Sequence, residues 1–186
     1  MTYVAFGNCD TPVGQLLIGC SEVGLLAVSY AGSSQRGTSK QDAENHLRKR
    51  VETHIPDACF QDDSTSEFAA VADELAEYFA GDRTTWNIPL DWRLTSGFRR
   101  AVQEAAYEIG YGETLSYGEL AAEAGNPRAA RAAGTAMATN PISIVVPCHR
   151  VVRSGGDIGN YGGGVDAKKY LLAFERSVLD NKHRGK

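Results

Sequence analysis

The residue pattern of this chain changes character near residue 92, and this change constrains the fold more than any other feature. Up to residue 30 the chain alternates apolar stretches with turn sequences at residues 11–14 and 22–24, which predicts β-strands joined by tight turns. Beyond residue 92 the apolar residues recur at helical spacing. We therefore expect an α/β protein of two domains, with residues 1–91 built around a β-sheet and residues 92–186 mainly helical.

Further elements are expected in the first half. Residues 31–39 read as a polar loop and residues 40–51 as an exposed helix. Residues 64–67 (Ser-Thr-Ser-Glu) have the form of a capping box, which predicts a second helix that stops at Gly81. Residues 86–90 are strand-like and close the predicted sheet domain.

The second half is predicted to contain a helix-turn-helix. A first helix is expected over residues 96–109. Residues 116–119 (Ser-Tyr-Gly-Glu) form another capping box, which predicts a short helix that ends at Gly125. Residues 126–127 (Asn-Pro) offer an N-cap and a first-turn proline, so the next helix is expected to start there and run to about residue 138. Two short helices joined by a tight turn are typical of a helix-turn-helix.

The helix predicted over residues 127–138 consists mainly of alanine, and Arg128 and Arg131 are its only charged residues. Such a helix could pack tightly into a protein core. Alternatively, small side chains such as Ala129, Ala130 and Gly134 would let its backbone approach DNA. A helix without long polar side chains cannot read base edges in the major groove, so it would bind by shape and phosphate contact, as minor-groove proteins do.

Charge is distributed unevenly along the chain. The formal net charge is −4. Residues 1–91 carry 6 Lys and Arg against 14 Asp and Glu, a balance of −8, whereas residues 92–186 carry 13 against 9, a balance of +4. This division suits a protein that meets a polyanion with its second half.

The four cysteines form no CxxC pair and are expected to be free thiols in a cytoplasmic protein. A zinc site made of Cys9, Cys20, His46 and His54 would not match any zinc-ligand spacing, so no metal is assigned. No apolar run is long enough to span a membrane, and the N-terminus lacks the basic and apolar regions of a signal peptide.

Cys148 is the residue with the strongest indication of chemistry. The apolar residues 142–146 are predicted to form a buried strand that leads directly into the sequence Pro-Cys-His-Arg-Val-Val of residues 147–152. A cysteine with an adjacent histidine, His149, at the end of a buried strand is a poor place for an inert thiol, but such adjacency alone does not specify a reaction.

The segment from residue 112 to residue 175 closely resembles the O6-alkylguanine-DNA alkyltransferases. The matching sequences are GETLSY at 112–117, GNPRAARA at 125–132, NPI at 140–142, IVVPCHRVV at 144–152, GNYGGG at 159–164 and KKYLLAFE at 168–175. The first half is similar more loosely, through TPVG at 11–14 and FAG at 79–81.

The resemblance implies a direct-reversal DNA repair protein that moves an alkyl group from O6-alkylguanine, and from O4-alkylthymine, to Cys148 in a single turnover. His149 would accept the thiol proton through a bound water, and Glu175 would orient His149, in the arrangement of a catalytic triad. Tyr117 would assist phosphate rotation and donate a proton to the departing guanine. Asn140 would be a buried asparagine whose amide ties the recognition helix to the strand before Cys148.

The resemblance also implies the remaining site residues. Arg131 would fill the stack that the extruded base vacates. Val151 would offer its carbonyl to the base, and Lys168 would support the loop that lines the alkyl pocket. That loop contains Tyr161, Gly162, Gly163 and Gly164.

The family further implies a ribonuclease-H-like fold for the first domain and no cofactor, because the alkyl donor is the DNA itself. The expected partner is double-stranded DNA with alkylated bases, bound by a monomer and not at a membrane. Two departures from the family pattern are Gln103, where tryptophan is usual, and Gly162, where some members have serine.

Two other functions remain possible at this point. A DNA-binding regulator would have no need of Cys148 beside His149. A cysteine hydrolase would need an oxyanion hole and would have no use for Arg131 on an alanine-rich helix.

Overall fold

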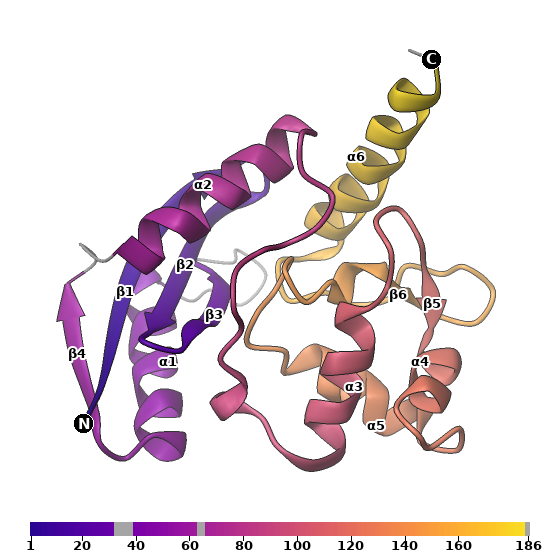
Figure 1. The fold of residues 1–186 in the computed structure, drawn as a ribbon. Helices are drawn as coiled ribbons and strands as arrows, with labels where there is room; N and C mark the ends of the chain where they lie inside the picture. The colour runs from indigo at the N-terminus through magenta and orange to yellow at the C-terminus, as the bar shows by residue number, and fades with distance from the viewer. Residues whose placement is uncertain (32–38, 63–65, 185–186) are drawn as a thin grey trace. The chain divides into compact units, whose positions relative to one another are not determined.

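The computed structural model describes residues 1–31, 39–62 and 66–184. Its contacts divide the chain into two compact units, Met1–Thr95 and Ser96–Lys186 (Figure 1). The boundary expected after residue 91 lies four residues earlier. Residues 92–95 contact the first unit, because Leu94 is fully buried in its hydrophobic core.

The first unit is built on a four-stranded sheet with the strand order β3-β2-β1-β4. The strands β1 (Thr2–Thr11), β2 (Gly14–Ser21) and β3 (Gly24–Tyr30) form the antiparallel meander that the sequence predicts. Its first turn depends on Gly14, whose φ of 104° few other residues adopt. The strand β4 (Ala58–Asp62), which the sequence analysis missed, pairs in parallel with β1 at the sheet edge.

Two helices cover opposite faces of this sheet (Figure 1). The helix α1 (Lys40–His54) begins at a capping box of Ser39 and Asp42 and buries Leu47 and Val51 in a cluster with the β1 residues Val4 and Phe6. Against the other face lies α2 (Ser66–Ala80), where the Phe68 ring leaves no room for a side chain at Gly7. Both predicted helices are confirmed. The capping box predicted at residues 64–67 and most of the loop at 31–39 lie outside the described residues.

Residues 86–90 do not form the predicted strand. A single bridge joins Leu90 to Leu25, with the Leu25 N–H donating to Pro89 O over 2.8 Å and the Asp91 N–H donating to Leu25 O over 2.8 Å. Pro89 has no N–H to donate, so a strand at this position could not continue its ladder.

The second unit contains the predicted helix-turn-helix. The helices α3 (Gly97–Tyr107), α4 (Tyr117–Glu123) and α5 (Ala130–Ala138) contact one another. The predicted capping box is present: the Ser116 hydroxyl accepts from Glu119 N–H, and the Glu119 carboxylate accepts from Ser116 N–H. Gly125 ends the first helix of the pair with a φ of 84°.

The expected start of α5 at residues 126–127 is wrong by three residues. The Asn126 side chain accepts from the Arg128 N–H over 3.3 Å, and the Asn126 carbonyl accepts from Ala129 N–H over 3.0 Å. The side chain of Asn126 thus closes a local turn instead of capping a helix, which is the competing use of asparagine near helix starts.

Residues 142–146 form a tight turn and not the predicted strand. The Val145 N–H donates to Ser143 O, the Val146 N–H donates to Ile142 O, and Ile144 has a φ of 71°. All five residues are buried. The apolar, β-branched pattern therefore predicted burial correctly but predicted a strand wrongly. An apolar run alone does not distinguish a buried strand from another buried conformation.

Beyond this turn the chain passes through the residues that matched the repair family. The 3₁₀ helix η2 (Cys148–Arg150) leads into β6 (Val151–Val152), which pairs in parallel with β5 (Leu115–Ser116). The long helix α6 (Val165–Arg184) packs against η2. In the described part of the chain, no helix combines the length and the apolar character needed to cross a membrane.

Candidate active site

Cys148 is held at the exit of the buried turn. It is the first residue of η2, only 6% exposed, and its N–H donates to Val146 O over 2.8 Å. A positive φ is costly for a β-branched residue, so the Ile144 backbone stores strain four residues before the cysteine.

Asn140 fastens this turn to the end of α5. Its side-chain Nδ2 donates to Val146 O over 2.9 Å, and its Oδ1 accepts from Ile142 N–H over 3.0 Å. The predicted tie between the helix and the segment before Cys148 is therefore present, although Asn140 is half-buried and not fully buried.

His149 and Glu175 meet in the interior of the second unit. The His149 Nε2 lies 2.8 Å from Glu175 Oε1, and both residues are fully buried. An ionised carboxylate can only accept, so Nε2 must carry the proton and Nδ1 must be the acceptor. Among the residues described, Nδ1 has no hydrogen-bond partner. Burial lowers the pKa of His149 more than the hydrogen bond to Glu175 raises it, so this imidazole rests neutral with a free lone pair.

Glu175 is itself fixed by three donors besides His149. The Arg150 Nε and Nη2 donate to its two oxygens over 3.0 Å and 2.9 Å, and the Gly112 N–H donates over 2.9 Å. Burial alone would raise the pKa of Glu175, but the hydrogen bonds and charges of His149 and Arg150 hold it well below its usual range. Glu175 is therefore ionised in the folded protein. It is buried, unlike a glutamate that forms a salt bridge on the surface of a helix.

Arg150 was given no role in the sequence analysis. It is 4% exposed, grips Glu175 with two N–H groups and donates from Nη1 to Ile109 O over 2.6 Å. A charged residue directly after a cysteine and a histidine in an apolar segment was the available signal, because a buried cation needs a buried anion.

Lys168 lies close enough to Cys148 for each charge to affect the other. It is fully buried, and its Nζ donates to Val151 O over 2.6 Å. Burial lowers the pKa of Lys168 to about 8. Burial also raises the pKa of Cys148, an effect that the Asn140 hydrogen bond and the Lys168 charge offset only in part. The site thus holds a protonated thiol beside a neutral imidazole.

Tyr117 stands at the same site from the side of the helix-turn-helix. It is the first residue of α4 and follows the strand that pairs with β6. A side chain at Gly134 of α5 would meet the Tyr117 ring at 3.9 Å, and one at Gly159 would meet the Tyr117 hydroxyl at 3.8 Å. Burial raises the pKa of Tyr117, and the negative charge of Cys148 raises it further when the thiol is ionised.

The glycine-rich loop is a turn next to His149. The Tyr161 ring lies edge-on to the His149 ring with 6.4 Å between centroids, and the Gly164 N–H donates to Tyr161 O over 3.0 Å. Gly162 is exposed and Gly163 is half-buried. The predicted pocket residues Val151, Tyr161 and Lys168 are therefore gathered around the cysteine and histidine.

The helix α5 has a buried face and an exposed face, so packing into a core accounts for one of its two faces. Its inner face buries Ala133, Ala136 and Met137. Gln103 of α3, fully buried at the position where the family usually has tryptophan, donates from Nε2 to Ala136 O over 3.0 Å.

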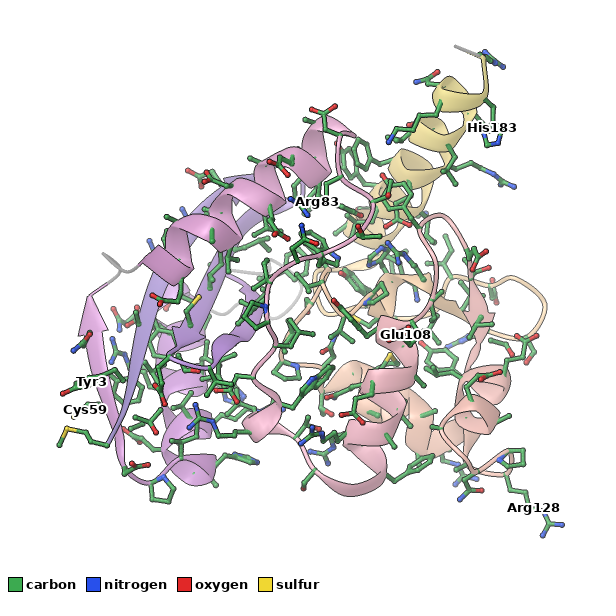
Figure 2. The ribbon with its side chains drawn as sticks, viewed as in Figure 1. Tyr3, Cys59, Arg83, Glu108, Arg128 and His183 are labelled. Carbon is green, nitrogen blue, oxygen red and sulfur yellow. The ribbon has the colours of Figure 1, made fainter. Side chains whose placement is uncertain are left out.

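The outer face of α5 and the turn before it are open to solvent. Arg131 and Arg128 are exposed, and Figure 2 shows Arg128 extending outward from the turn. Ala129, Ala130 and Gly134 are half-buried. The predicted DNA-contacting residues thus lie on α5 and on the turn that precedes it.

Comparisons with known proteins identify the family. A family model described as "6-O-methylguanine DNA methyltransferase, DNA binding domain" matches residues 97–177, and one described as the "ribonuclease-like domain" of that family matches residues 4–92. A methylated-DNA–protein-cysteine methyltransferase of Mycolicibacterium paratuberculosis is 47% identical over 156 residues, covering 84% of this chain and 88% of that protein. This chain belongs to the 6-O-methylguanine DNA methyltransferase family.

Other members of the methyltransferase family match over almost the whole chain. A methylated-DNA–protein-cysteine methyltransferase of Methanosarcina acetivorans is 36% identical and covers 95% of this chain and 99% of its own length. The crystal structure of Mycobacterium tuberculosis OGT in complex with DNA aligns with a TM-score of 0.74 at 35% identity, covering 95% of this chain and 94% of that one. The predicted fold class, a sheet domain followed by a helical domain with a helix-turn-helix, is confirmed.

The described residues of this family member include no group of three or more His, Cys, Asp or Glu side chains placed to hold a metal ion. Cys9 and Cys59 are half-buried free thiols, and Cys20 is a buried one on β2.

Proposed function

We propose that this chain repairs alkylated DNA by transferring the alkyl group from O6 of guanine to the sulfur of Cys148, as a methylated-DNA–protein-cysteine methyltransferase. The observation that carries the proposal is the buried contact of 2.8 Å between His149 and Glu175 directly beside the cysteine, which leaves the His149 Nδ1 free to accept a proton. Membership of the family supports the same activity.

The reaction uses the groups gathered around Cys148. The thiol gives its proton to His149 Nδ1 through a water, and the sulfur attacks the alkyl carbon as that carbon's bond to guanine O6 breaks. The electron pair of the broken bond stays on the guanine, and Tyr117 supplies the proton that neutralises it. The product is a thioether. Because water does not hydrolyse a thioether, each molecule reacts once.

The charges around the site match this sequence of steps. Glu175 is an anion that stabilises the imidazolium form of His149 while the proton resides there. Lys168 carries the opposite charge near Cys148 and stabilises its thiolate. Arg150 keeps Glu175 ionised and in place.

DNA would be bound through the helix-turn-helix. The target base is closed off in the helical stack, so it must be extruded before Cys148 can reach it. We propose that Arg131 occupies the vacated stack and that Arg128 contacts the backbone, with the small residues Ala129, Ala130 and Gly134 permitting close approach. The exposure of both arginines supports this assignment. The similar Mycobacterium tuberculosis OGT has been crystallised in complex with DNA, which supports DNA as the partner here.

The extruded base would lie in a pocket made by Val151, whose carbonyl accepts from Lys168 Nζ, and the loop of Tyr161, Gly162 and Gly163. Gly162 has no hydroxyl, so a polar contact to guanine O6 at that point must come from the backbone N–H. The same pocket would admit O4-alkylthymine. We further propose that the chain works as a monomer, since every residue assigned to the reaction lies in one unit of one chain. We propose the cytoplasm as its location.

The test is to incubate the protein with DNA that carries O6-methylguanine and to weigh the protein. A gain of one methyl group per molecule, lost in Cys148→Ala while DNA binding is retained, supports the proposal. Binding without a mass change would indicate a regulator, and repeated turnover would indicate a hydrolase. Full transfer by Cys148→Ala would refute the assignment of the acceptor.

A further inference from the structure

Arg153 is a charged residue of the second unit whose position none of the proposed steps uses. It follows β6 directly, just as Tyr117 follows β5 directly, and these two strands are parallel with Ser116 opposite Val152. Because parallel neighbours leave a sheet at the same end, the two side chains start from the same edge of the strand pair.

The Arg153 side chain turns back toward the tyrosine. A side chain built at Gly159 would meet Arg153 Nε at 3.6 Å and the Tyr117 hydroxyl at 3.8 Å, so the guanidinium and the hydroxyl lie around the same point. Gly159 has a φ of 70°, and its missing side chain keeps this point open.

Hydrogen bonds fix the backbone around Arg153, whereas its guanidinium has no partner among the described residues. The Arg153 N–H donates to Asp157 O over 2.8 Å, and its carbonyl accepts from Gly156 N–H over 3.0 Å, which closes a tight turn. Within the described ranges the guanidinium forms no ion pair and no hydrogen bond, and the residue is exposed. The nearby buried groups sense its charge, because Arg153 lowers the pKa of both Tyr117 and Lys168.

We propose that Arg153 is a further substrate-binding residue, whose guanidinium binds a DNA phosphate next to the extruded nucleotide at the Tyr117 hydroxyl. A free guanidinium presents N–H groups in a planar fork that matches a phosphate. Because this one is exposed and unpaired, it breaks no ion pair within the protein when it binds a polyanion. This inference rests on the proposed function. It adds a contact that would hold the backbone where Tyr117 acts.

The first experiment compares Arg153→Gln with Arg176→Gln, which removes the same charge from an exposed arginine of α6. Single-turnover rates are measured at subsaturating protein with methylated duplex over a range of salt concentrations, and with free O6-benzylguanine, which has no phosphate. We expect Arg153→Gln to slow repair of the duplex about tenfold at low salt and to reduce the salt dependence by about one phosphate contact. The reaction with free base should be unchanged, and Arg176→Gln should behave as wild type on both substrates.

The second experiment locates the phosphate. Duplexes in which one phosphate near the lesion is replaced by a neutral methylphosphonate are tested in turn. For one methylphosphonate position, the wild-type rate should fall to the rate that Arg153→Gln shows on unmodified DNA. The same replacement should not slow Arg153→Gln any further. Such a cycle measures the direct pair. Arg153→Lys, which keeps the charge without the fork, should restore part of the rate.

The outcomes separate the two proposals. No transfer to wild-type protein from either substrate would refute the proposed function. Normal transfer with equal behaviour of Arg153→Gln and Arg176→Gln would refute only the role of Arg153. An equal loss by Arg153→Gln on duplex and free base would also overturn it, because the residue would then act on the pocket and not on a phosphate.

Discussion

Glu175→Gln is the substitution whose effects follow most directly from the geometry. Glutamine has the same shape as glutamate but offers one acceptor oxygen and one donor group. The groups around Glu175 are all donors: His149 Nε2, two N–H groups of Arg150 and the Gly112 N–H. At least one donor must therefore face the new amide, and Arg150, only 4% exposed, loses its counter-charge.

The loss can be sized from the burial of this pair. Removing one partner of a buried ion pair costs roughly 3–5 kcal/mol, mainly because the other charge stays buried. For a chain of this length each kcal/mol corresponds to roughly 2–4 °C, so the melting temperature should fall by at least about 6 °C. Glu119→Gln is the matched control. Glu119 is exposed and its capping bond can be made by glutamine, so that variant should melt within about 1 °C of wild type.

The same substitution should slow the chemistry. The hydrogen bond and charge of Glu175 raise the pKa of His149 against the effect of burial. Without them His149 is a weaker base, and we expect transfer from O6-benzylguanine to slow by about 10²–10⁴, the usual range for impaired general-base catalysis. Rates are measured at a temperature where circular dichroism shows both proteins folded.

The two effects can be separated by adding Arg150→Met to Glu175→Gln. If an uncompensated guanidinium causes the instability, the double variant should melt above the single one while remaining slow. A Glu175→Gln protein that melts within about 1 °C of wild type and reacts at the same rate would refute the reasoning on both counts.

Three other predictions concern single residues. Asn140→Ala should destabilise the protein by about 1–3 kcal/mol in urea unfolding, since the Val146 carbonyl loses its donor and Ile142 N–H its acceptor; an unchanged midpoint would contradict this. Arg131→Ala should slow repair of duplex far more than reaction with free O6-benzylguanine, because only the duplex requires extrusion; equal losses would assign Arg131 to the fold. Lys168 has a folded pKa of about 8, below its unfolded value of about 10.4. Keeping Lys168 protonated in the folded state therefore lowers the free energy of unfolding by about 3 kcal/mol at pH 7. This destabilisation disappears as pH rises from about 8 to about 10.4. The unfolding free energy of wild type should therefore rise over that window relative to Lys168→Met, and a constant difference would exclude a buried charged lysine.

Local signals were enough to predict the elements whose ends are set by their own residues. The capping box at Ser116 and Glu119, the turn at Gly14 and the stop at Gly125 all depend on contacts within a few residues. The helix-turn-helix was predictable for this reason.

The elements that the sequence analysis predicted wrongly or missed have two different causes. Residues 142–146 turn because Asn140 supplies both a donor and an acceptor to the backbone there, and nothing in the apolar run itself indicates this. The strand β4 is short and exists because β1 offers it an edge. A neighbouring side chain decides the first case, and pairing with a distant strand decides the second.

The reactive residues of the candidate site could be predicted from the sequence, but the hydrogen-bond network around them could not. Cys148 and His149 are adjacent in the sequence, but Glu175 is 26 residues away and entered through resemblance to a family. The role of Arg150 follows only from three-dimensional contact, because Ile109 and Gly112, which complete the Glu175 network, come from a different segment.

The electrostatics of the site suit a nucleophile that can be used only once. Burial raises the pKa of Cys148 and lowers that of His149, so proton transfer between them is unfavourable in the resting protein. A thiol is far less nucleophilic than a thiolate, which protects Cys148 from small alkylating molecules. The charges that stabilise the transferred state, Glu175 beside the imidazole and Lys168 near the sulfur, are nevertheless fixed in advance. On the proposed mechanism, a bound substrate completes the path by which the Cys148 proton reaches His149, and the thiolate then forms. The reactivity of Cys148 is therefore confined to the bound lesion.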